Sequence, residues 1–217
     1  LGIPCIYYGT EQAFAGPAQS QLQFVFGEGW NDGGNSGDRF LREAMFGPEH
    51  PRAPHTDDLP TQVAGKDESL PGFGPFGSAG AHCFDNESPA YIRIALLAAA
   101  RAKLPVLRLG RQYLRQVRLP GTGFEFPPAG EIVAWSRILD NIEAVCVVNP
   151  NPHQSRGGDV VVSSELWRPG TEFTVAVNTG VGGPLLGSRL TVKGGSPAYV
   201  EIRGVEPGEV VVLVKEF

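Results

Sequence analysis

A carboxylate and an amide follow the first apolar stretch of the chain, in a place where they could bind a ligand. Glu11 and Gln12 come shortly after the apolar run of residues 1–8. Both can hydrogen-bond the hydroxyl groups of a small molecule, although Glu11 could equally form an ion pair with an arginine. Tyr7 and Tyr8 point to opposite faces of a strand, so at most one of them reaches a ligand and the other packs. The candidate ligand-binding residues are Tyr8, Glu11 and Gln12, with core packing as the alternative for Tyr8.

No other group of residues has the spacing of a catalytic or metal site. The acidic residues of the loop-rich region do not match an oxygen-rich cation loop. The four histidines and three cysteines form none of the pairs that zinc motifs require, and Gly34-Asn-Ser-Gly37 lacks the spacing of a serine nucleophile turn. We interpret these side chains as turn, surface or packing residues; they are Asp32, Asp38, Asp57, Asp58, His50, His55, His82, His153, Cys5, Cys83 and Cys146. The sequence predicts no cofactor and no bound metal.

A short strand and a long connection would position the candidate residues. Residues 1–9 are apolar, aromatic and β-branched and end in glycine, the pattern of a parallel strand covered on both faces. Pro4 cannot donate to a sheet ladder, so it counts against a central strand unless a bulge accommodates it. Between residue 10 and about residue 84 the chain is crowded with Gly, Pro, Asn and Asp, which predicts a long, mostly irregular loop.

The clearest local pattern predicts a helix over residues 89–103. Ser88 can cap it, Pro89 suits its first position, and Pro105 prevents its continuation. Its apolar face is suited to packing on a sheet, and it is made of Ile92, Ala95, Leu96, Ala99 and Ala102.

The last half of the chain has the spacing of an antiparallel β-sandwich. Strands are predicted at residues 112–119, 131–138, 142–148, 159–166, 172–178, 189–193, 197–203 and 209–216. We place the domain boundary near residues 105–111, which gives domains of residues 1–108 and 109–217. We expect residues 112–217 to fold on their own, because so many strands can bury a core.

Charge and composition narrow the class of partner. With 18 basic and 23 acidic residues, the chain lacks the basic surplus of a protein that binds nucleic acid or an anionic membrane. No apolar run is long enough to cross a bilayer, so we expect no membrane partner. An odd number of distant cysteines argues against a disulfide framework and favours free thiols in a reducing, cytoplasmic compartment.

Several motifs resemble the end of an α-amylase-type enzyme of glycoside hydrolase family thirteen. Gly2-Ile-Pro-Cys-Ile-Tyr-Tyr-Gly-Thr-Glu-Gln12 is similar to the eighth barrel strand of that family and the loop that follows it. Arg42-Glu-Ala-Met-Phe46 resembles the Arg-Glu-Pro-Met-Trp stretch that often comes next. The segment from Tyr91 to Arg101, with Leu107-Arg-Leu-Gly110, resembles the last barrel helix and its exit.

The resemblance continues into the second half and so covers nearly the whole chain. Ile132-Val-Ala-Trp-Ser-Arg137, followed by Ala144-Val-Cys-Val-Val-Asn149, is similar to the paired strands that open the C-terminal domain of the family. The fold implied is an α+β fragment, in which strand 8, a long loop and helix 8 of a (β/α)8 barrel precede an all-β antiparallel sandwich.

The resemblance also implies what the chain does. The catalytic carboxylates and the calcium site of the family would lie upstream of Leu1, so this piece would be the inactive C-terminal portion of a glycosidase or glucanotransferase acting on α-glucosidic linkages. Tyr8, Glu11 and Gln12 would touch its substrate, since the loop after strand 8 opens on the active-site face. The alternative is a non-catalytic β-sandwich module that binds carbohydrate or protein, which explains the sandwich but not the buried strand.

The expected partners follow from the same picture. An α-glucan or oligosaccharide would bind through the parent enzyme. Residues 1–8 alone would form a hydrophobic edge strand, which we expect to be covered by the missing barrel portion or by self-association.

Overall fold

The structure is a computed structural model, and it describes residues 6, 10–12, 86–87 and 89–216. Residues 95–216 lie within one compact unit. The predicted strand at residues 1–9, apart from the exposed Ile6, and nearly all of the predicted loop lie outside the described residues. The end of a barrel is therefore not shown, and the boundary between residues 108 and 109 stays a prediction.

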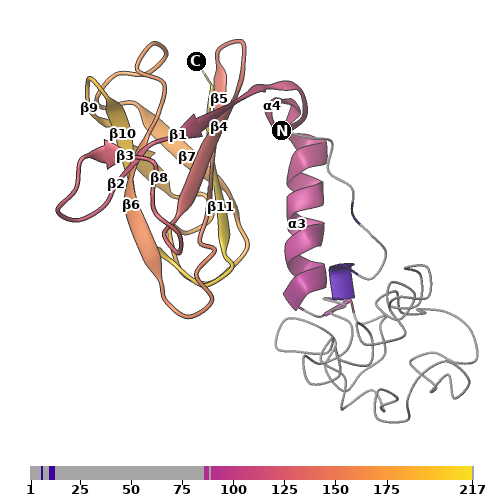
Figure 1. The fold of residues 1–217 in the computed structure, drawn as a ribbon. Helices are drawn as coiled ribbons and strands as arrows, with labels where there is room; N and C mark the ends of the chain where they lie inside the picture. The colour runs from indigo at the N-terminus through magenta and orange to yellow at the C-terminus, as the bar shows by residue number, and fades with distance from the viewer. Residues whose placement is uncertain (1–5, 7–9, 13–85, 88, 217) are drawn as a thin grey trace, which may run out of the picture. The chain divides into compact units, whose positions relative to one another are not determined.

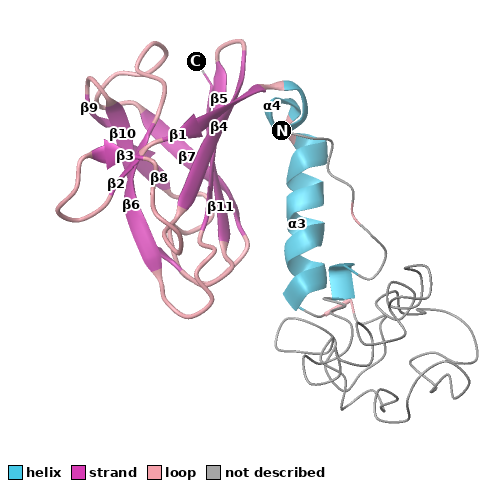
Figure 2. Cartoon of the chain, in the orientation of Figure 1, coloured by secondary structure: helices cyan, strands magenta, loops and turns pink. Residues whose placement is uncertain are grey.

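The second half of the chain forms two antiparallel sheets packed as a sandwich (Figures 1 and 2). The six-stranded sheet has the order β1 (Arg111–Arg115), β4 (Val133–Leu139), β5 (Ile142–Val148), β11 (Val210–Glu216), β7 (Glu172–Asn178) and β8 (Arg189–Thr191). The five-stranded sheet has the order β3 (Phe124–Glu125), β2 (Val117–Arg118), β6 (Arg156–Val161), β10 (Ala198–Val205) and β9 (Lys193–Gly194). The predicted antiparallel sandwich is confirmed.

The main core lies between the sheets, because alternate residues of each strand point inward. Trp167 and Phe173 anchor it, with their rings edge to face and 5.7 Å between centroids. Buried valines fill much of the remaining space, namely Val117, Val145, Val147, Val160, Val162, Val175, Val192, Val200, Val205 and Val211.

One fully buried carboxylate interrupts this apolar core. Glu143 of β5 accepts hydrogen bonds at Oε1 from Arg115 Nη2 (2.8 Å) and Ser136 Oγ (2.5 Å). Its Oε2 accepts hydrogen bonds from Trp167 Nε1 (2.6 Å) and the backbone amide of Ser163 (3.1 Å). These bonds replace the water that the carboxylate loses, so the charge is compensated inside the sandwich.

Two chain segments cross from one sheet to the other. The predicted strand at 112–119 is divided at Gln116 into β1 of the six-stranded sheet and β2 of the five-stranded sheet. The predicted strand at 189–193 is likewise divided at Val192 into β8 and β9. The two sheets are therefore joined at two places, and at each place a single residue lies between a strand of one sheet and a strand of the other.

The predicted helix is confirmed as α3 (Pro89–Lys103), and a second helix that was not predicted, α4 (Pro105–Leu109), follows directly. Pro105 ends α3 as expected, but it also occupies the first turn of α4, where its missing N–H is not needed.

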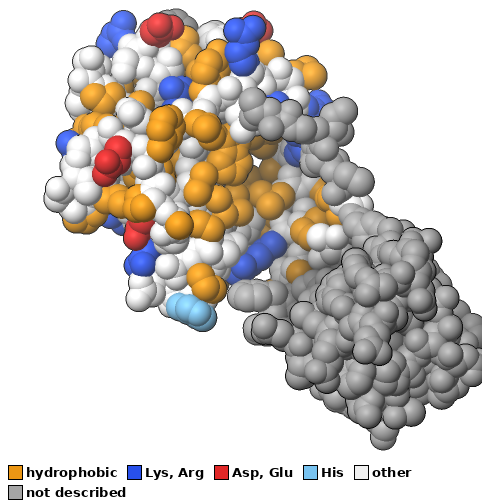
Figure 3. All heavy atoms as spheres, viewed as in Figure 1, with side chains coloured by type: hydrophobic (Ala, Val, Ile, Leu, Met, Phe, Trp, Pro, Cys, Tyr) orange, Lys and Arg blue, Asp and Glu red, His pale blue; other side chains and the backbone are white. Residues whose placement is uncertain are grey.

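The helices contribute to a second apolar cluster, on the outer face of the six-stranded sheet. Its buried residues are Val106, Ala144, Cys146, Val177 and Val212. Packed against it are Leu97 and Ala100 of α3, Leu107 of α4 and Leu104, which links the two helices. The apolar face of α3 that is suited to packing on a sheet is exposed in this chain: Ile92 is 45% and Leu96 43% accessible. The helix thus contributes a different side to this cluster. Figure 3 shows hydrophobic side chains gathered on the face of the sandwich turned to the viewer.

Candidate functional site

The predicted ligand-binding residues are only partly described. Glu11 and Gln12 lie in η1 (Thr10–Gln12), a single 3-10 turn, and Glu11 is half-buried. Tyr8 lies outside the described residues. The structure does not test the role of these three side chains, which stays a prediction.

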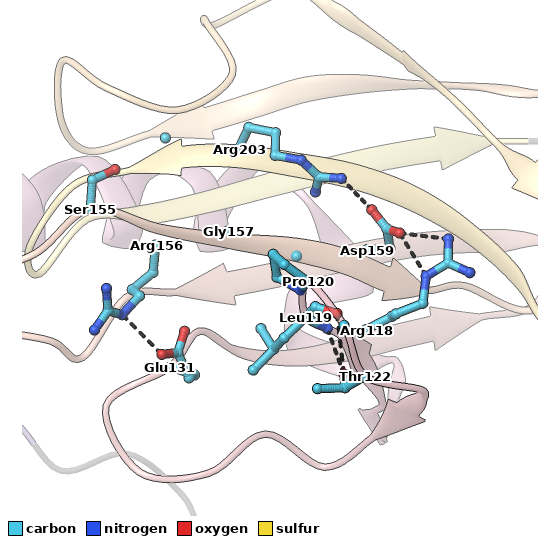
Figure 4. A pocket seen from close by; sticks show the side chains of 13 residues that line it. Arg118, Leu119, Pro120, Thr122, Glu131, Ser155, Arg156, Gly157, Asp159 and Arg203 are labelled. Atoms are coloured by element: carbon cyan, nitrogen blue, oxygen red, sulfur yellow. Dashed lines mark hydrogen bonds and ion pairs between the residues drawn. The ribbon is translucent and has the colours of Figure 1, made fainter.

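A candidate site that the sequence did not indicate lies on the five-stranded sheet (Figure 4). It is an open depression of about 710 Å³. Residues of β2, β6 and β10 line it, together with the turn after β2, and they include Arg118, Leu119, Pro120, Thr122, Glu131, Ser155, Arg156, Gly157, Asp159 and Arg203.

On one side of the depression, two arginines bind one buried carboxylate. Arg118 donates from Nε (2.9 Å) and Nη2 (2.7 Å) to Asp159 Oδ2. Arg203 donates from Nη2 to Asp159 Oδ1 at 2.5 Å. The side chain of Asp159 is 9% exposed, against 37% for Arg118 and 58% for Arg203. The negative charge is therefore covered, and the guanidinium groups are the charges that face solvent.

The same ion pairs shift two pKa values. Burial acts to raise the pKa of Asp159, but the hydrogen bonds from Arg203 and Arg118 outweigh it, so this pKa lies below its ordinary value. The hydrogen bond to Asp159 is also the main cause that raises the pKa of Arg118. Both groups stay charged at neutral pH.

Two aromatic rings support Arg118. Its guanidinium carbon lies 4.7 Å from the centroid of the Phe124 ring and 4.7 Å from that of the Tyr199 ring. These are cation–π distances, so the rings hold the guanidinium in place over the sheet. Because the guanidinium covers a face of each ring, those faces are not available for stacking on a sugar.

A second ion pair lies on the other side of the depression (Figure 4). Arg156 Nε lies 3.1 Å from Glu131 Oε1 and donates a longer hydrogen bond, 3.3 Å, to the carbonyl of Gly130. Gly157 follows Arg156 in β6, and a Cβ atom there would lie 2.6 Å from the carbonyl oxygen of Ile202. Only glycine fits at this point, and it leaves main chain rather than a side chain in the lining.

The charges of the site are unbalanced in favour of binding an anion. Three arginines line the depression, with two carboxylates.

Within the part of the chain that the structure describes, no group of three or more His, Cys, Asp or Glu side chains could hold a metal ion. Among the same residues, no helix is long and apolar enough to cross a membrane.

Sequence reasoning missed this site because its members are far apart. Asp159 lies 41 residues from Arg118 and 44 from Arg203, and only the strand pairing brings them together. The one feature of the sequence that could have indicated the site is the pair Gly157 and Gly158, because glycine inside a strand often marks a close approach of another part of the chain.

The chain has structural likeness to solved proteins but no match in sequence. No protein-family model matches the chain, and no curated protein sequence matches it. Among solved structures, the chain is similar to CldA, described as the first cyclomaltodextrin glucanotransferase with a three-domain ABC distribution, with a TM-score of 0.39 and 18% identity. The match covers 62% of this chain and 23% of CldA.

Proposed function

We propose that this chain is the C-terminal portion of an α-amylase-type glycosidase or glucanotransferase that acts on α-glucosidic linkages. In this proposal α3 is the last barrel helix and the sandwich is a non-catalytic accessory domain attached to it. The motifs that resemble the family support the assignment. The two segments that resemble its paired opening strands overlap β4 and β5, which pair with each other in the sandwich.

The observation that carries the proposal is the two-sided character of α3. One side, with Leu97 and Ala100, packs against the apolar cluster that includes Val106 of α4. Another side exposes Ile92 and Leu96, which are 45% and 43% accessible. Residues four apart lie on one face of a helix, so these two form a continuous apolar strip. A barrel to the other side of α3 would cover this strip.

The substrate contacts belong to the same proposal. Glu11 and Gln12 would sit after the eighth barrel strand, on the face where such barrels bind substrate. The chemistry itself needs a carboxylate nucleophile and a protonated carboxyl group across the scissile bond. We assign neither role to a residue of this chain, and we expect the pure chain not to hydrolyse starch or maltooligosaccharides.

The substitution Leu96→Asp tests the proposal in two settings. In the isolated chain Leu96 is 43% accessible, so the substitution should cost no more than about 1 kcal/mol of unfolding free energy, from lost partial burial and the lower helix propensity of aspartate. In the longer gene product, an aspartate buried against the barrel should cost about 3 kcal/mol or more and lower the yield of active enzyme. Ala98→Asp, at another exposed position of α3, is the matched control. Equal, small effects of Leu96→Asp in both proteins would contradict the proposal, as would a longer gene product that lacks amylase-type carboxylates.

A further inference from the structure

We propose that the depression on the five-stranded sheet binds the phosphate group of a small molecule, with Arg203 and Arg118 as the residues that receive it. This proposal does not rest on the function proposed above. It starts from the arrangement of charges: Asp159 is buried beneath the two guanidinium groups, and both of its oxygens already accept hydrogen bonds. A ligand that reaches this side of the depression therefore meets the guanidinium donors before it meets Asp159.

The donors that remain are suited to an oxyanion. A guanidinium carries five N–H groups in a fixed fork. Among the described residues, Arg203 uses Nη2 on Asp159 and Nη1 on the carbonyl of Ile202, which leaves its Nε without a hydrogen bond. Planar guanidinium donors match the geometry of phosphate, and the resulting charge-assisted hydrogen bonds are the stronger kind.

The site is also held in position before a ligand arrives. Asp159 fixes Arg118 and Arg203 from below, and Phe124 and Tyr199 fix Arg118 from the side. Positioned donors lose less conformational entropy on binding than free surface arginines do. The neighbouring cation Lys193 is paired with Glu201 at 2.7 Å, and neither of these residues lines the depression.

The rest of the ligand would lie toward Arg156. This residue is across the depression, where its Nε pairs with Glu131 and donates to the carbonyl of Gly130. Within the described residues its two terminal nitrogens make no hydrogen bond. The volume of about 710 Å³ exceeds what a bare phosphate fills. Arg156 and Glu131 together offer donors and acceptors for hydroxyl groups, so a phosphorylated polyol or sugar fits better than the free ion.

A neutral oligosaccharide is the competing ligand, and the geometry disfavours it. Sugar rings bind proteins by placing their apolar faces on aromatic rings, and here the guanidinium of Arg118 occupies that position on Phe124 and Tyr199. The test therefore compares phosphorylated and neutral sugars directly.

Calorimetric titration of the full chain at low ionic strength tests the proposal with three probes: inorganic phosphate, glucose 6-phosphate and maltotriose. We expect saturable binding of the two phosphates, tighter for glucose 6-phosphate, and no binding of maltotriose. Binding should weaken as salt is raised, because partly exposed charges are screened. Lack of binding of both phosphates, or binding of maltotriose alone, would overturn the proposal.

Substitutions then locate the site. Arg203→Gln should weaken the binding of both phosphates about tenfold, since it removes charge-assisted hydrogen bonds. Arg156→Gln should weaken glucose 6-phosphate several-fold and leave inorganic phosphate nearly unchanged. The matched control is Arg189→Gln, at an exposed ion pair on the edge of the other sheet, which should change neither affinity.

The substitutions are chosen so that folding does not obscure the result. Arg203 is 58% exposed and Arg118 still pairs with Asp159 in its absence, so Arg203→Gln should fold. Thermal unfolding followed by circular dichroism checks this, and Arg203→Lys, which keeps the charge but not the fork, provides a second variant expected to weaken both phosphates. Unchanged phosphate binding by folded Arg203→Gln or Arg203→Lys would overturn the assignment.

Discussion

The thiol of Cys146 lies in the apolar cluster on the outer face of the six-stranded sheet, and this burial raises its pKa to about 12. A thiol with that pKa is about 10⁻⁴ ionised at pH 8, and the thiolate is the reactive form. We therefore expect a Cys5→Ser/Cys83→Ser variant to resist iodoacetamide at pH 8 and to react only after unfolding in urea. Intact mass at successive times measures this, and modification of the native protein at the rate of an unfolded peptide would contradict it.

The lowered pKa of Asp159 gives a second prediction at this scale. An acid whose pKa is lower in the folded protein contributes stability above its ordinary pKa near 3.8, and this contribution is lost as the pH falls through the folded value. Asp159→Asn has no such titration. The difference in unfolding free energy between the wild-type protein and the variant should therefore shrink as the pH is lowered from 7 to 3, as measured by urea unfolding. A difference that stays constant or grows would contradict the ion pairs with Arg118 and Arg203.

At the scale of elements, Glu143 joins β5 to its neighbours. Its carboxylate links Arg115 of β1, Ser136 of β4 and the segment that carries Trp167. Glu143→Ala would leave the charge of Arg115, 14% exposed, without its partner inside the sandwich. We expect a loss of about 3–5 kcal/mol in the free energy of unfolding, the range found when one member of a buried pair is removed.

The control for this prediction is another glutamate of the same sheet. Glu172 pairs with Arg189 at 3.0 Å, but the two side chains are 45% and 69% exposed. Glu172→Ala should cost no more than about 0.5–1 kcal/mol, because exposed ion pairs contribute little. Denaturant unfolding measures the loss of unfolding free energy in both variants. Equal losses would contradict the role of Glu143 in joining β5 to its neighbours.

The elements that could be predicted are those whose boundaries carry local signals. Proline and helix-forming residues defined α3, and clean alternation defined β7 at residues 172–178. The hairpin strand β5 also has the predicted bounds, 142–148. The two-residue strand β3 has too few residues to form a pattern.

Other features could not be predicted because they depend on tertiary structure. The alternation of residues 111–118 is the same whether a strand stays in one sheet or crosses to the other, so the change at Gln116 leaves no mark in the sequence. The depression has the same origin, since β2, β6 and β10 meet only when the five-stranded sheet forms.

At the scale of the whole unit, the helices complete the sandwich. Residues 111–217 alone would expose Ala144, Cys146, Val177 and Val212, which α3, α4 and the linking Leu104 help to cover. We expect this shorter chain to fold with a free energy of unfolding roughly 2–4 kcal/mol below that of residues 89–217, the range expected from losing the burial of Val106 and its neighbours. Urea unfolding and light scattering of the two chains measure the difference. Equal stability, with no association of the shorter chain, would contradict a role for α3 and α4.

The crossings at Gln116 and Val192 have a consequence for how the molecule opens. A sandwich whose sheets are joined only by loops can lose one sheet while the other persists. Here β1 continues into β2, and β8 continues into β9. A strand that separates from one sheet therefore displaces the strand next to it in sequence, which is hydrogen-bonded in the other sheet. Local openings should therefore merge into one cooperative unit. The slowest-exchanging amides of β5 in one sheet and β6 in the other should then report the same opening free energy, equal to that of global unfolding.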